Sequence, residues 1–158
     1  MVDPGVDETV TTVEAGLFVL HTCLAAVWLG AMTYSLSVVQ PKVDRFFAAD
    51  DDAREAFLAL IASGNRWRVV ALIGGIAASG VALWWLTGRD DAAVQVVRAL
   101  ALTAAAGIFW YVSWRHWPAR VFALGAERDV LRRRLRVLAG TMTGLVAVVF
   151  VLGLVVAA

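Results

Sequence analysis

Two polar residues stand inside otherwise apolar stretches of the sequence, His21 and Arg98. A polar group inside a hydrophobic segment costs free energy and therefore indicates a partner or a ligand. Imidazole is the commonest metal ligand in proteins, and a guanidinium pairs well with carboxylates and phosphates. The two residue types therefore point to a cofactor site, either haem b with His21 as axial ligand and Arg98 on a propionate, or a copper ion.

Trp28 and Met32 follow His21 at helical spacings and share its helix face. We expect Trp28 to shape the cofactor pocket and Met32 to be a further metal donor. Met32 lies about 16 Å further along the helix axis, so copper would need a series of stations along a path. Cys23, the single cysteine, points to nearly the opposite face from His21.

A plainer reading of the two residues stays open. Arg98 can extend toward the nearby headgroups, and His21 can bond a carbonyl or hydroxyl of a neighbouring helix. The second histidine, His116, stands almost a membrane thickness from His21, and we expect it in an interfacial belt of basic and aromatic residues. The sequence contains no motif of a hydrolase or transferase, so catalytic residues are not assigned and an enzymatic role stays open.

Four apolar segments have about the length that crosses a bilayer, which takes roughly 20 helical residues. They run over residues 13–39, 67–87, 92–114 and 137–158. With 61% hydrophobic residues and a mean hydropathy of +0.76, the chain suits one integral domain, 1–158, in a lipid bilayer. The sequence predicts an all-α polytopic membrane protein, a bundle of four transmembrane helices. His21 and Arg98 then lie about 9 Å below the same membrane surface and can share a cavity.

Positive charge is unevenly distributed over the connections. Twelve of the fourteen Lys and Arg residues lie on the side away from the N-terminus. Because such loops stay cytoplasmic, we expect the cytoplasmic membrane of a prokaryote, with the N- and C-termini outside. This explanation of the charge is sufficient, so we do not expect nucleic acid as a partner.

Shorter features predict how the helices begin and end. Asp50 is suited to cap a short cytoplasmic amphipathic helix over residues 53–63, between the first two spans, and Gly64 is suited to end it. Pro41 and Pro118 predict helix ends after the first and third spans.

Gly140 and Gly144 form a GxxxG pattern on the fourth span. Such small residues let helix backbones approach closely. We expect them to pack inside the bundle, with homodimerisation as the sharper alternative. A scaffold or accessory subunit that assembles with a membrane partner through these glycines is the second functional hypothesis. A small-solute transporter is less favoured, because no interrupted helices or inverted repeat are evident.

The opening helix resembles those of known membrane proteins. Leu20-His21, then residues 26–30 (AVWLG), then Gln40-Pro41 are similar to CopD-like copper resistance proteins and to HemJ-type protoporphyrinogen oxidases. The resemblance implies a helical bundle with a histidine in its outer half, here His21, used for copper handling or haem binding. It also places Arg98 where the HemJ type has a functional lysine. Arginine does not readily lose its proton, so a lysine-like proton transfer is not carried over.

Overall fold

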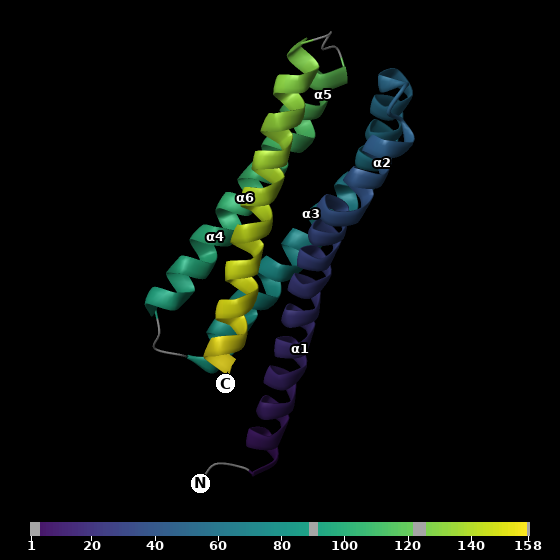
Figure 1. Cartoon of the computed structure of the whole chain (residues 1–158). Coiled ribbons are helices and arrows are strands. Elements are labelled where there is room, and N and C mark those ends of the chain that lie inside the picture. The colour runs from purple at the N-terminus through teal and green to yellow at the C-terminus, as the bar shows by residue number, and fades with distance from the viewer. Residues whose placement is uncertain (1–3, 89–91, 122–125, 158) are drawn as a thin grey trace.

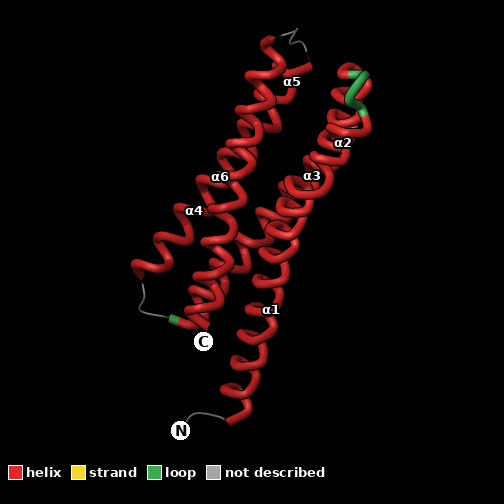
Figure 2. The backbone as a smooth tube through the Cα atoms, viewed as in Figure 1, coloured by secondary structure: helices red, strands yellow, loops and turns green. Residues whose placement is uncertain are grey.

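The computed structural model describes residues 4–88, 92–121 and 126–157, with side chains over 11–88, 92–119 and 127–155. Every regular element in these ranges is helical (Figures 1 and 2). In chain order they are α1 (Pro4–Tyr34), the π-helical turn η1 (Ser35–Val39), α2 (Gln40–Phe46), α3 (Asp51–Thr87), α4 (Ala92–Tyr111), the π-helical turn η2 (Val112–His116), α5 (Trp117–Val121) and α6 (Ala126–Ala157).

Within the described ranges, four helical stretches are long and apolar enough to cross a membrane. They are Thr11–Phe46, Asp51–Thr87, Ala92–Ala119 and Glu127–Val155. Each contains the described part of one predicted span, which confirms the all-α fold with four helices of spanning length. The 37 residues of α3 amount to about 56 Å, so this helix is much longer than a hydrocarbon core of about 30 Å.

The predicted helix over 53–63 forms, but its predicted end at Gly64 is wrong. Asp50 caps the helix as expected, since its carboxylate accepts from the backbone N–H of Ala53 at 2.9 Å. The helix then continues through Gly64 into the second span as α3. A glycine inside a helix costs only about 1 kcal/mol relative to alanine, which continued packing on either side can offset. The helix ends instead at Gly88, a left-handed C-cap with φ 53°.

The predicted stops at Pro41 and Pro118 are also wrong. In both places a five-residue π-helical turn ends two residues before the proline, and the helical path continues past it. Proline lacks an N–H and crowds the carbonyl four residues earlier, and a wider turn relieves that crowding. The first and third spans therefore continue as α2 and α5 at the same end of the bundle (Figure 1).

The helices pack in the order α3, α1, α6 and α4. The close pairs are α1 with α3, α1 with α6 and α4 with α6, while α3 and α4 are not a close pair. The buried core at the centre contains Trp28, Ile76, Ala105, Met142 and Val146. The start of α1 and the end of α6 lie at one end of the bundle, opposite α2 and α5 (Figure 1). The bundle thus has one weakly closed side, between α3 and α4.

Candidate functional site

His21 and Arg98 meet inside the bundle. The Arg98 Nη2 atom lies 2.9 Å from the His21 Nε2 atom, although 77 residues separate them in sequence. His21 is 5% exposed and Arg98 is half-buried. The expectation that α1 and α4 present them at matching depth is therefore correct, and the guanidinium turns inward onto the imidazole.

The second ring nitrogen of His21 has a partner on α3. His21 Nδ1 lies 2.9 Å from Ser79 Oγ, and Ser79 Oγ in turn donates to the carbonyl of Gly75 at 2.7 Å. Because guanidinium N–H groups only donate, Nε2 must accept from Arg98, and the ring proton then sits on Nδ1 and is donated to Ser79. The arrangement fits a neutral imidazole whose two nitrogens both have protein partners.

Sequence reasoning missed Ser79 as a member of this cluster. Its signal was available, because Ser79 is the only hydroxyl residue in the interior of the 67–87 span. In the structure Ser79 is 5% exposed and holds the orientation of the His21 ring.

Two glycines leave room for the cluster. A Cβ atom at Gly80 of α3 would lie 3.2 Å from His21 Cε1, and one at Gly153 of α6 would lie 3.4 Å from Arg98 Nη2. The first distance is shorter than an ordinary van der Waals contact, whereas the second is at the lower limit of such a contact. All four long helices therefore contribute to the site. The titratable and charged groups come from α1 and α4, and glycines of α3 and α6 bring the helix backbone close to those groups.

No carboxylate partners Arg98 in the described part of the chain. Its contacts there are His21 and a long bond of 3.3 Å from Nη1 to Gln95 Oε1, and its Nε has no acceptor. A cation in this position normally pairs with an acid or faces a water-filled space. The site therefore holds a positive charge that no described protein group neutralises.

A cavity of about 270 Å³ lies against this cluster. Residues of α3 and α4 form most of its wall, with His21 and Val149 contributed by α1 and α6. The wall is mainly apolar, and its polar members are His21, Gln95, Arg98 and Thr103. Such a cavity has the shape and polarity of a small ligand site, with an apolar lining and a few convergent polar groups.

The structure does not bring Trp28 and Met32 into this cavity. Both line a different cavity of about 480 Å³ nearer to α2 and α5, together with Met142. Trp28 is 2% exposed and belongs to the core. Cys23 is exposed. Among the described residues, no three His, Cys, Asp or Glu side chains are grouped as a metal would need, and Met32 lines a different cavity from His21.

His116 is buried within the protein. It lies in η2, at the opposite end of α4 from Arg98, and is 1% exposed. Its ring centroid is 6.3 Å from that of Tyr111. Its side chain is therefore covered by protein at this end of the bundle.

Gly140 and Gly144 also depart from expectation, because they do not pack inside the bundle. Both are exposed, and a Cβ atom at either would meet no heavy atom within 4 Å. The GxxxG face of α6 therefore points away from the other helices. Close helix approach inside the bundle occurs instead at Gly75 and Gly80 of α3, which face Leu24 and His21 of α1.

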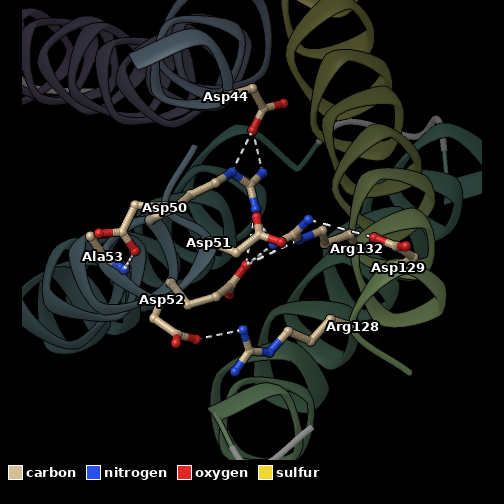
Figure 3. Close-up of polar contacts among 10 residues, drawn as sticks. Asp44, Asp50, Asp51, Asp52, Ala53, Arg128, Asp129 and Arg132 are labelled. Atoms are coloured by element: carbon tan, nitrogen blue, oxygen red, sulfur yellow. Dashed lines mark hydrogen bonds and ion pairs between the residues drawn. The ribbon is translucent and has the colours of Figure 1, made fainter. Parts of the chain in front are cut away.

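A network of ion pairs joins α2, α3 and α6 at the far end of the bundle, where most of the basic residues lie (Figure 3). Arg54, 8% exposed, binds Asp44 of α2 and also Glu55 at 2.9 Å. Arg132 of α6 binds Asp51 at 2.8 Å and Glu55 at 3.1 Å. These arginines hold the extended ends of the helices together, so they act within the fold.

Comparison with known proteins adds no relative: no family model, no curated protein and no solved structure matches this chain. The assignment of the site therefore rests on its own geometry, in a chain built as a small membrane protein with four helices of spanning length.

Proposed function

We propose that this small membrane protein binds a ligand with an anionic group, a carboxylate or a phosphate, at Arg98. The observation that carries the proposal is the guanidinium of Arg98, which reaches into the bundle and has no carboxylate partner among the described residues. A charged side chain costs about 2.5–3.5 kcal/mol at the centre of a membrane-spanning helix on insertion scales, and a part of that cost applies to Arg98 in the outer half. An anionic ligand would offset that cost.

His21 supports this role by orienting the guanidinium. Fixed on one side by Ser79, the neutral ring accepts from Nη2 without adding charge. The Nε atom, which has no acceptor, and the weakly bonded Nη1 atom are the donors left for a ligand. Each of these N–H groups can donate a charge-assisted hydrogen bond to a carboxylate or phosphate oxygen.

The orientation in the membrane is part of the proposal. We infer that the end with α2 and α5 is cytoplasmic, because the basic residues concentrate there. Arg98 then lies in the outer half of a prokaryotic plasma membrane, and both termini are outside.

Haem b fits this site in one respect only. Its propionates are carboxylates of the kind that Arg98 can bind. Its iron would need a free imidazole nitrogen, whereas Arg98 holds Nε2 of His21 and Ser79 holds Nδ1. The second donor expected for copper, Met32, lines the other cavity. We therefore propose recognition through Arg98 and no metal bond to His21.

Native mass spectrometry of protein purified from membranes in mild detergent tests the proposal. The wild type should carry a bound anionic molecule that Arg98→Gln loses and that Arg45→Gln, a change at an exposed arginine of α2, retains. Equal occupancy in Arg98→Gln would refute the proposal. A Soret band that disappears in His21→Ala would replace it with ligation of haem iron.

A second candidate function is assembly through α6. The specific observation is the empty space beside Gly140 and Gly144, on a helix face that no other described helix covers. We propose a homodimer with close helix approach along this face. Chemical cross-linking in membranes should detect a dimer that Gly144→Leu abolishes and Gly74→Leu, at another glycine with nothing nearby, preserves. Monomeric wild-type protein would rule it out.

A further inference from the structure

The cavity at Arg98 opens sideways, between α3 and α4. Its wall comes mainly from these two helices. The lining residues are Ile76, Ala77, Gly80, Val81 and Trp84 of α3, and Gln95, Arg98, Ala99, Leu102 and Thr103 of α4. These two helices are not a close pair, whereas α3 packs closely on α1 and α4 packs closely on α6. The gap in packing between α3 and α4 and the cavity therefore coincide.

The rim of the cavity is exposed and mainly apolar, with Thr103 as its polar member. Val81 is 54% exposed and Trp84 is 52% exposed, and Ala77, Ala99 and Thr103 are also exposed. All five lie on helices of spanning length. In a bilayer, exposed residues at these positions face acyl chains, so the mouth of the cavity faces lipid.

The His21–Arg98–Ser79 cluster lies at the back of the cavity, away from this rim. His21 and Ser79 are each 5% exposed, and the guanidinium of Arg98 reaches back to His21. Polarity therefore increases from the lipid-facing mouth inward. A ligand that matches this gradient has an anionic head and an apolar tail.

The path from the nearer end of the bundle is much narrower. A cavity of about 30 Å³, lined by Phe18, Leu83 and Thr87 among others, lies beside Arg98 on that side. A volume of this order holds a water molecule but not a carboxylate with a chain attached. Among the described residues, this narrow space admits water to Arg98 from the end of the bundle, whereas the opening wide enough for a bulky ligand is at the side.

We infer that the ligand of this site is an anionic amphiphile of the bilayer, which enters between α3 and α4. Its carboxylate or phosphate binds Arg98, and its tail lies in the groove bordered by Ala77 and Ala99. The inference rests on the proposed function and names the ligand class for the same site. Charge complementarity with Arg98 selects the head, and the apolar rim selects the tail.

A spin-labelled fatty acid provides the probe. Stearate with a nitroxide near its methyl end is added to phosphatidylcholine vesicles containing the full chain, at alkaline pH so that the carboxyl group is ionised. Electron paramagnetic resonance separates probe held by the protein from probe free in the bilayer. We expect the wild type to hold stearate about tenfold more tightly than its uncharged methyl ester, a difference of about 1.4 kcal/mol.

Competition distinguishes the source of the anionic group. Unlabelled stearate and phosphatidic acid are added separately, and displacement by one or by both shows whether the site accepts a carboxylate, a phosphate or either. Butyrate and inorganic phosphate carry the same groups without a long tail. Displacement by these two at the concentrations that suffice for their long-chain counterparts would overturn the inference.

Paired substitutions at the mouth test the sideways route. Ala77→Trp on α3 and Ala99→Trp on α4 fill the groove without touching Arg98, and each should reduce the held probe about tenfold. Ala78→Trp and Ala104→Trp change exposed alanines on the same helices that do not line the cavity, and should leave the held probe unchanged. Helicity and monodisperse elution equal to those of the wild type confirm that a variant is folded. Because the two mouth variants lie on different helices, the test still works if one of them fails to fold.

The outcomes separate the inference from the proposed function. If both mouth variants hold the probe like their controls while Arg98→Gln loses it, the anion site stands and the lipid route is wrong. If Arg98→Gln holds the probe as well as the wild type does, the proposed function itself fails. Loss in both mouth variants and in Arg98→Gln, with both controls intact, supports the inference.

Discussion

The guanidinium of Arg98 donates to the imidazole of His21 across the interior of the bundle, over 2.9 Å. The contact links α4 to α1, which pack mainly on α6 and α3 and not on each other. It therefore depends on two long side chains reaching a common point rather than on neighbouring helices. Any variant that moves one of the pair should affect the other.

A double-mutant cycle should show this coupling directly. His21→Ala removes the acceptor and Arg98→Gln removes the charged donor, so each should change the free energy of unfolding. Together they should deviate from additivity by about 0.5–3 kcal/mol, the usual range for residues in contact. The measurement is thermal or denaturant unfolding in detergent. Strict additivity would mean that the two side chains do not interact.

Gly80→Ala should disturb the site from its α3 side. Its new Cβ would lie 3.2 Å from His21 Cε1, which forces the ring to shift and should cost about 1–3 kcal/mol. Gly74→Ala on the same helix meets nothing within 4 Å and should be neutral or stabilising, by up to about 1 kcal/mol. Unfolding measurements on both variants provide the check. A Gly80→Ala protein as stable as Gly74→Ala would indicate that His21 sits elsewhere.

Arg132→Gln should weaken the far end of the bundle. The substitution removes the ion pairs of Arg132 with Asp51 and Glu55, and it lowers the positive charge around Glu55. We expect a loss of about 1–3 kcal/mol at low ionic strength and a smaller loss in high salt, because the network is partly exposed. Arg133→Gln changes an exposed neighbour and serves as the control. Identical stabilities of the two variants would contradict this account of the network.

The proposed orientation predicts which end reacts with a reagent that does not cross membranes. In a Cys23→Ser background, Thr11→Cys near the start of α1 should be labelled by a charged maleimide in intact cells. Arg45→Cys in α2 should react only after permeabilisation, since its end is expected to be cytoplasmic. The reverse pattern would invert the topology and place Arg98 in the inner leaflet.

Hydropathy and spacing were sufficient to predict the four helices, the Asp50 cap and the matched depth of His21 and Arg98. These features depend on local sequence and on length, which a single chain displays. The ends of helices were harder to predict, because Gly64, Pro41 and Pro118 carry local signals for breaks that tertiary packing and π-helical turns override.

Helix rotation could not be predicted. On α6 nearly every position of the span is apolar, so no periodic stripe tells which side faces the bundle. Gly140 and Gly144 consequently were assigned to the interior, although both are exposed. The same limit hid Ser79, whose role depends on α3 turning it toward His21. The pairing of Arg54 with Asp44 depends on the path of the chain through Phe47 and Asp50, which composition does not reveal.

The most direct test of the central claim is a solid-state NMR distance measurement between a bound carboxylate and Arg98. Stearate labelled with ¹³C at its carboxyl carbon is bound to protein with ¹⁵N-labelled arginine in phosphatidylcholine bilayers. We predict strong dipolar dephasing of the carboxyl signal in the wild type and its loss in Arg98→Gln, with Arg45→Gln unchanged. Dephasing that persists in Arg98→Gln, or that is absent from the wild type, would contradict anion binding at this site.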